Sequence, residues 1–200
     1  MARLLLLFVL VLPAYAGPPE DATVRIRVER DEVMQFGSGT IISSQPGRTL
    51  VLTCDHVFEG VKYVEVELAG NSRRSVPATI VLRDEPSDVA LVLISDKEVF
   101  PFCPVATVAP AARDVVYSVG FNHGLRGKPR VDCVVVSLST ATGGPHWTLC
   151  TKGSVFGRSG GGLFNARGEV VGVTSGYIPK TGIGVYVGFD HILDAIKKGQ

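Results

Sequence analysis

Three short segments of the chain each hold one reactive polar side chain beside an apolar run. His56 ends one such run, Asp88 begins another, and Ser159 lies in the glycine-rich segment Gly157–Gly162. A serine hydroxyl is a weak nucleophile until a base takes its proton, and an imidazole is the better base when an acid fixes its tautomer. The segments therefore predict nucleophilic catalysis, with Ser159 as nucleophile, His56 as general base and Asp88 as orienting acid.

The glycines around Ser159 have a second role in this chemistry. A tight turn is needed to direct the backbone N–H groups of Gly157 and Ser159 to one point, where an oxyanion would form. We therefore predict an oxyanion hole made by these two residues. An ordinary glycine-rich turn has the same composition, and a lone histidine is more often structural, so the prediction depends on all three segments together.

Two other carboxylates lie near these segments in the sequence. Asp84 is an alternative to Asp88 but stands in a turn, whereas Asp88 begins an apolar run, where a buried carboxylate needs a hydrogen-bond partner. Asp55 precedes His56 directly. Adjacent strand side chains point to opposite faces, so Asp55 is not expected to orient the ring of His56 and is expected to be exposed.

The segments that must position these residues have the pattern of β-strands. Apolar and charged residues alternate strictly within Ala22–Arg30, which indicates a strand with one buried face. Further short runs are separated by turn signals, at 39–43, 49–53, 61–68, 78–83 and 89–94. A proline-containing stretch over 100–113 predicts a crossover, followed by runs at 114–120, 131–139, 147–151, 162–165, 170–175 and 184–189. Asp190 can cap a final helix over His191–Lys198.

The order His, Asp, Ser and the residues around each resemble the chymotrypsin-like serine proteases, in the style of the bacterial high-temperature-requirement proteases. The resemblance extends from Gly37 to Asp190. It implies an all-β fold of two six-stranded antiparallel β-barrels with a short C-terminal helix. Residues 17–105 would form the first barrel and 106–200 the second barrel and the helix. It also implies a serine endopeptidase that cleaves a peptide or protein substrate through an acyl-enzyme.

The same resemblance implies a substrate pocket. Gly153 matches the position at the base of the primary pocket, and Gly176 and Gly184 match its walls. Thr174, Ser175 and Gly176 would offer a backbone edge to an extended substrate. No acid stands at the base, so the pocket is expected to favour apolar or small side chains.

Arg158 departs from the pattern of the digestive members of the family. Those proteins have an aspartate directly before the nucleophile, and it captures the ammonium group of a freed N-terminus. An arginine cannot pair with an ammonium group, so this route of activation is absent. The sequence does not show how the loop before Ser159 is held.

The first sixteen residues have the pattern of a secretory signal peptide. A short basic start precedes the apolar run Leu4–Leu12, and Ala14-Tyr15-Ala16 is a small-x-small cleavage signal. The apolar run is too short to span a bilayer, so cleavage after Ala16 and export to the periplasm or outside are expected.

Four cysteines in an exported chain predict disulfide bonds, with three possible pairings. Cys133 and Cys150 lie on candidate neighbouring strands of the second half and are expected to pair, which leaves Cys54 and Cys103 for each other. None of the cysteines has the C-x-x-C spacing of a zinc site, and neither a metal nor a cofactor is expected.

Two other functions fit part of this pattern. The segment around Ser159 also fits the G-x-S-x-G elbow of esterase-type hydrolases, a fold that needs a helix directly after the serine. A catalytically silent, peptide-binding relative would have the same residues with a collapsed oxyanion hole. Because the formal net charge is only +1, neither nucleic acid nor, after signal cleavage, a membrane is expected as a partner.

Overall fold

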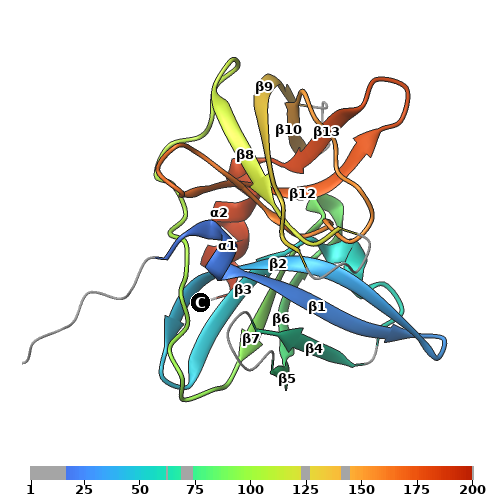
Figure 1. Cartoon of the computed structure of the whole chain (residues 1–200), viewed down its shortest axis with the longest axis vertical. Helices are drawn as coiled ribbons and strands as arrows, with labels where there is room; N and C mark the ends of the chain where they lie inside the picture. Colours follow the sequence, from blue (N-terminus) through green and yellow to red (C-terminus); the bar gives the residue numbers. More distant parts are fainter. Residues whose placement is uncertain (1–16, 62, 69–73, 123–126, 141–144, 200) are drawn as a thin grey trace, which may run out of the picture.

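The computed structural model describes residues 17–61, 63–68, 74–122, 127–140 and 145–199. The predicted signal peptide at 1–16 lies outside these residues. Within them, the strands form two layers, which lie one above the other in Figure 1. The all-β fold class predicted from the sequence is confirmed.

Strands from the first half of the chain form a seven-stranded antiparallel sheet in the order β5-β4-β1-β2-β3-β7-β6. Their bounds are Thr23–Arg30 (β1), Val33–Gln45 (β2), Arg48–Thr53 (β3), Val64–Glu67 (β4), Ser75–Pro77 (β5), Thr79–Asp84 (β6) and Val89–Ile94 (β7). This sheet replaces the six-stranded closed barrel that was expected. The additional strand is β5, which is too short for its sequence to show an alternating pattern.

The second half forms a closed six-stranded barrel in the order β10-β13-β12-β11-β8-β9, as the resemblance implied. Its strands are Val115–Val119 (β8), Arg130–Thr140 (β9), His146–Cys150 (β10), Gly162–Phe164 (β11), Val170–Ile178 (β12) and Ile183–Val187 (β13). The crossover from the first sheet joins this barrel through a parallel bridge between Val105 and Val170.

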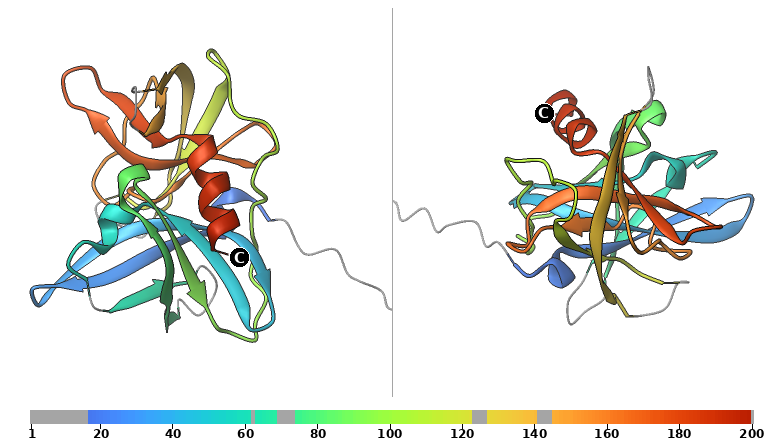
Figure 2. Two further views of the ribbon diagram at one scale, coloured as in Figure 1. Left: turned by 180° about the vertical axis from the view of Figure 1, so that it is seen from behind. Right: turned by 90° about the horizontal axis from the view of Figure 1, so that it is seen from above.

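A C-terminal helix, α2 (Phe189–Lys198), follows the barrel in sequence but packs against strand β7 of the first sheet as well. Figure 2 shows it lying across the junction of the two layers. Gly188 is its N-cap; Asp190, the predicted cap, instead lies 3.2 Å from Nδ1 of His146. The helix buries Ile192 and Ala195 in a core that the first sheet shares with the barrel.

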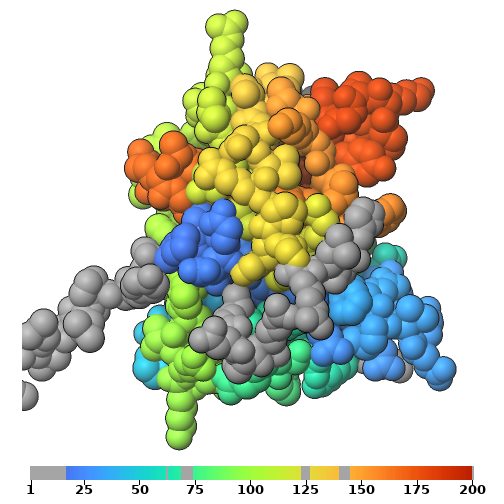
Figure 3. All heavy atoms as spheres, in the orientation of Figure 1, coloured from blue at the N-terminus to red at the C-terminus, as the bar shows by residue number. Residues whose placement is uncertain are grey.

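A short N-terminal helix, α1 (Pro19–Ala22), leads into β1 and joins the two layers on the other side. Lys128, just before β9, donates hydrogen bonds to the carbonyls of Glu20 and Thr23. Figure 3 shows these blue N-terminal residues against the yellow segment that leads into β9. None of the helices within the described residues is long and apolar enough to cross a membrane.

Candidate active site

His56 lies where the chain leaves the first sheet. Strand β3 ends at Thr53, and a short 3-10 helix, η1 (Asp55–Phe58), carries His56. Val57 and Phe58 are buried beneath this helix, whereas the side chain of His56 is 45% exposed. The exposed ring of His56 is therefore carried by a short helix whose apolar side chains are packed in the core.

Asp88 reaches His56 from the start of β7. It ends a second short 3-10 helix, η2 (Glu85–Ser87), in a left-handed conformation with φ 51° and ψ 45°. Its Oδ1 accepts a hydrogen bond from the backbone N–H of His56 at 3.0 Å, and both carboxylate oxygens lie 3.0 Å from His56 Nδ1. A carboxylate at Nδ1 favours the tautomer with its proton there and leaves Nε2 free to accept a proton.

The contact between His56 and Asp88 shifts the pKa of both groups. The hydrogen bond with Asp88 raises the pKa of His56, although burial opposes this. Burial alone would raise the pKa of Asp88, but its hydrogen bonds with His56 and Ser175 together hold that pKa below its usual value. Ser175 Oγ donates a short hydrogen bond to Asp88 Oδ2, so this residue, predicted as a substrate contact, supports the acid.

Ser159 approaches His56 from the second barrel. The two residues line one pocket of about 270 Å³, together with Phe36 and Gly157. Gly160 has φ 85°, and a Cβ there would lie 2.0 Å from Oγ1 of Thr53 at the end of β3. Only glycine fits both the conformation and the space, so the Ser159 turn can pack directly against the strand that precedes His56.

Ser38 connects the Ser159 turn to the first sheet, and sequence reasoning missed it. Its backbone N–H donates to the carbonyl of Ser159 at 2.7 Å, and its Oγ donates to the carbonyl of Gly157 at 2.7 Å. The same Oγ accepts from the N–H of Phe121 at 2.9 Å. The small-residue segment Gly37–Gly39 was the only signal in the sequence for this close approach.

The guanidinium of Arg158 holds the other side of the turn. This residue is only 2% exposed, and burial lowers its pKa. It donates to the carbonyl and hydroxyl of Ser118, at 2.9 and 2.7 Å, and to the carbonyl of Pro129 at 2.9 Å. Asn122 Oδ1 accepts at 3.0 Å. Arg158 thus fixes the residue before the nucleophile to the barrel through uncharged acceptors.

The glycines predicted to outline a primary pocket lie close together. A Cβ on Gly184 would lie 2.2 Å from the carbonyl of Lys152 and 3.1 Å from the Cα of Gly153. A Cβ on Gly153 would lie 2.6 Å from that of Tyr177, whereas a Cβ on Gly176 would meet open space. Gly153 and Gly184 are therefore closely packed against their neighbours, whereas Gly176 has open space where a side chain would be.

Thr174 does not provide the backbone edge that was expected of it. Its N–H donates to the carbonyl of Gly161 and its carbonyl accepts from the N–H of Gly160, both at 2.8 Å. These bonds hold the Ser159 turn against β12. The prediction was wrong because the sequence does not show that the turn itself pairs with this strand.

Asp55 is buried rather than exposed. Its two carboxylate oxygens accept hydrogen bonds from the Nε and Nη2 atoms of Arg83 at 2.7 and 2.8 Å. The expectation assumed that a solvated face lay opposite His56. In the structure Arg83 of β6 covers that face. Both carboxylate oxygens of Asp55 bond to Arg83 rather than to the ring of His56.

All four cysteines are free thiols in the structure, so neither predicted disulfide is formed. Cys133 and Cys150 lie on the paired strands β9 and β10, and the neighbouring Cys150 thiol lowers the pKa of Cys133 although burial opposes this. Cys54 Sγ lies 3.7 Å from His56 Nε2, whereas Cys103 Sγ contacts the carbonyl of Gly17. The pairing of Cys54 with Cys103 is wrong because the two thiols have these different neighbours.

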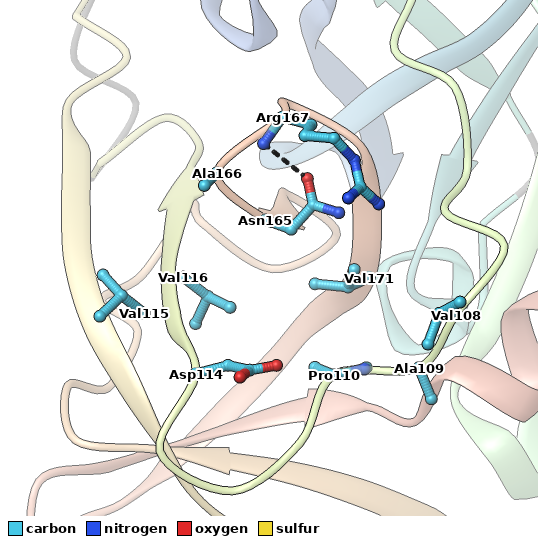
Figure 4. A pocket seen from close by; sticks show the side chains of 10 residues that line it. All are labelled: Val108, Ala109, Pro110, Asp114, Val115, Val116, Asn165, Ala166, Arg167 and Val171. Atoms are coloured by element: carbon cyan, nitrogen blue, oxygen red, sulfur yellow. Dashed lines mark hydrogen bonds between the residues drawn. The ribbon is translucent and has the colours of Figure 1, made fainter.

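A second pocket, of about 520 Å³, lies between the crossover and the turn that joins β11 to β12 (Figure 4). The charged side chains on its wall are engaged locally. Asp114 accepts a hydrogen bond from the N–H of Ala111, and Arg167 pairs with Glu169. Although it is larger, this pocket offers no base beside a nucleophile, and the pocket of His56 and Ser159 is the better candidate.

Residues 37–173 match the protein family described as trypsin-like peptidase domain. A probable periplasmic serine protease of Haemophilus influenzae is 31% identical over 74% of this chain and 32% of its own length. The periplasmic serine endoprotease DegP of Escherichia coli is 26% identical over 80% of this chain and 34% of its own length. The chain thus spans 32% and 34% of these two relatives.

Solved structures are similar in fold. The serine endoprotease from Yersinia pestis has a TM-score of 0.76 at 24% identity, covering 90% of this chain and 63% of its own. A protease from M. tuberculosis in its active form has a TM-score of 0.79 at 21% identity, covering 90% of this chain and 81% of its own. The family match includes His56, Asp88 and Ser159 and spans most of the chain. This chain therefore belongs to the family of trypsin-like peptidase domains.

Proposed function

We propose that the protein is an exported serine endopeptidase that uses Ser159, His56 and Asp88 as a catalytic triad. The observation that carries the proposal is the pairing of the Asp88 carboxylate with Nδ1 of a histidine that shares a pocket with Ser159. Residues 17–105 would supply the base and the acid, and residues 106–200 the nucleophile.

In the proposed reaction, Ser159 Oγ attacks the carbonyl carbon of a peptide bond while His56 Nε2 takes the hydroxyl proton. Asp88 holds the ring and stabilises the imidazolium that forms. The N–H groups of Gly157 and Ser159 would stabilise the oxyanion. His56 then gives its proton to the leaving amine as the C–N bond breaks, and water hydrolyses the acyl-enzyme by the same steps.

The substrate is a peptide or protein with an apolar or small side chain at the cleaved position. The uncharged positions Gly153, Gly176 and Gly184 support this choice, because they provide no partner for a charged side chain. A peptide-library profile tests it. Dominance of Arg, Lys, Asp or Glu at the cleaved position would contradict the proposal.

Export with cleavage after Ala16 is also proposed, and the periplasmic names of the relatives support it. N-terminal sequencing of the exported protein should begin at Gly17. In an oxidising compartment the adjacent thiols of Cys133 and Cys150 would form a disulfide. Peptide mapping without reduction should recover them as one linked pair, and recovery of both as free thiols would rule the bridge out.

The triad is tested with a fluorophosphonate probe, which labels only an activated serine. The label should attach to the wild type and to Ser154→Ala, a control in the same loop, but not to Ser159→Ala. Peptide hydrolysis by Ser159→Ala should fall by several orders of magnitude. Equal labelling of the two variants would assign the nucleophile elsewhere.

The two alternatives make different predictions. A silent peptide-binding relative would bind peptides without taking up the label. An esterase-type elbow requires a helix directly after the serine, but Gly162–Phe164 is strand β11. The structure therefore does not fit the second alternative.

A further inference from the structure

The Cys54 thiol, the His56 ring and the Asp88 carboxylate offer three metal-ligand atoms within 4.8 Å of one another. The proposed triad uses only the ring and the carboxylate. Cys54 is fully buried at the end of β3, and its Sγ lies 3.7 Å from Nε2, the nitrogen opposite the one that binds Asp88. Burial raises the pKa of this thiol well above its usual value, so it is not poised as a nucleophile.

The separation of Sγ and Nε2 fits two ligands of one zinc ion. Zinc binds thiolate sulfur at about 2.3 Å and imidazole nitrogen at about 2.0 Å, so tetrahedral geometry separates the two ligand atoms by about 3.5 Å. The observed 3.7 Å requires almost no movement of either side chain.

The surroundings of His56 also fit a metal ligand. Zinc-bound histidines usually donate their other ring N–H to a carboxylate, which fixes the tautomer and makes the ligand more basic. Asp88 already occupies this position, and Ser175 holds Asp88 in turn. The pocket that His56 shares with Ser159 gives solvent access to the ring, and water from it would complete the coordination.

We propose that Cys54 and His56 form an inhibitory site for Zn²⁺ within the active site. Binding replaces the thiol proton: the S–H bond breaks, a Zn–S bond forms, and the proton leaves to solvent. The ion then occupies the lone pair of Nε2, which can no longer accept a proton from Ser159. The inhibitory effect rests on the proposed peptidase function, whereas metal binding itself does not.

Binding is tested with Co²⁺, which reports its ligands by absorption. The mature full-length chain should show a near-ultraviolet thiolate-to-cobalt charge-transfer band and the intense visible bands of tetrahedral cobalt. Cys54→Ala and the size-matched Cys54→Ser should lose the charge-transfer band. Cys103→Ala, which changes another buried free thiol of the same half, should retain it. A band that persists in both Cys54 variants, with their melting curves showing folded protein, overturns the proposal.

Inhibition is tested with Zn²⁺ in a peptide-hydrolysis assay, with each variant compared to its own rate in the presence of a chelator. The half-inhibitory Zn²⁺ concentration should rise at least about tenfold in Cys54→Ala and stay unchanged in Cys103→Ala. Equal inhibition of Cys54→Ala and the wild type would overturn the site. If the wild type hydrolyses no peptide, the proposed function fails, and the cobalt spectrum still decides the metal site.

Discussion

The two halves of the candidate site are held in different ways. In the first sheet, His56 and Asp88 are two ionisable side chains bonded to each other, and each shifts the pKa of the other. In the second barrel, the charge of Arg158 is surrounded by the carbonyls and hydroxyls of neutral residues. One half therefore pairs two ionisable groups, and the other surrounds a permanent charge with fixed dipoles.

This difference matches what each half must do. A general base has to gain and lose a proton, and an acidic partner makes the charged form accessible. The turn that carries Ser159 has to keep one shape, and a guanidinium is suited to this because it stays protonated throughout the working range of pH. Substitutions and pH should therefore affect the two halves differently.

The largest effect is expected from Asp88→Asn. An amide favours the wrong tautomer of His56 and cannot stabilise the imidazolium, so kcat should fall roughly 10⁴-fold while the fold is retained. Asp84→Asn is the matched control, because Asp84 was the competing acid in the sequence and its carboxylate instead faces Lys198. Equal losses of kcat in the two variants would contradict the assignment.

Arg158→Met should be the most destabilising change in the second half. It leaves the buried carbonyl and hydroxyl of Ser118 without a donor, and we expect the free energy of unfolding to drop by roughly 2–5 kcal/mol. Arg130→Met removes a half-exposed arginine bonded to Asp132 and should cost about 0–1 kcal/mol. Urea denaturation measures both. Similar midpoints for the two variants would show that Arg158 does not hold the turn.

Ser38→Ala tests the contact between the two halves. Losing the hydroxyl leaves the Gly157 carbonyl and the Phe121 N–H without a partner, which should lower the free energy of unfolding by about 1–3 kcal/mol. The exposed Ser95→Ala should stay within about 0.5 kcal/mol of the wild type. Because Gly157 belongs to the proposed oxyanion hole, kcat of Ser38→Ala should fall more than KM rises; an unchanged kcat would limit Ser38 to a structural role.

The pH dependence should separate activity from stability. Activity needs neutral His56, so kcat/KM should fall about tenfold per pH unit below its raised pKa. Stability has the opposite sign: the raised pKa of His56 stabilises the fold below the usual pKa, and this gain is lost as pH rises through the raised one. The lowered pKa of Asp88 stabilises the fold at pH values above the usual pKa of an aspartate. This stabilisation is lost as pH falls through the lowered pKa. Urea midpoints that rise with pH over the same range in which activity rises would contradict the sign expected for His56.

The sequence predicted the parts of the site that depend on residue type and chain order. Alternation identified most strands, and the apolar runs next to His56 and Asp88 located the paired side chains. The sequence could not reveal the contacts of Ser38, the burial of Asp55 or the backbone pairing of Thr174. Each of these depends on a segment far away in the chain. The short strand β5 was missed for a local reason, since three residues cannot establish a period.

The position of α2 has a consequence for how the protein acquires its structure. The helix follows every strand in the chain, yet Ile192 and Ala195 complete the core beneath β7, a strand made about a hundred residues earlier. During synthesis or export the chain emerges starting from its N-terminus. The first sheet therefore cannot complete its core until this helix has also emerged. We therefore expect the core beneath His56 and Asp88 to close only after the segment of Ser159 has also emerged.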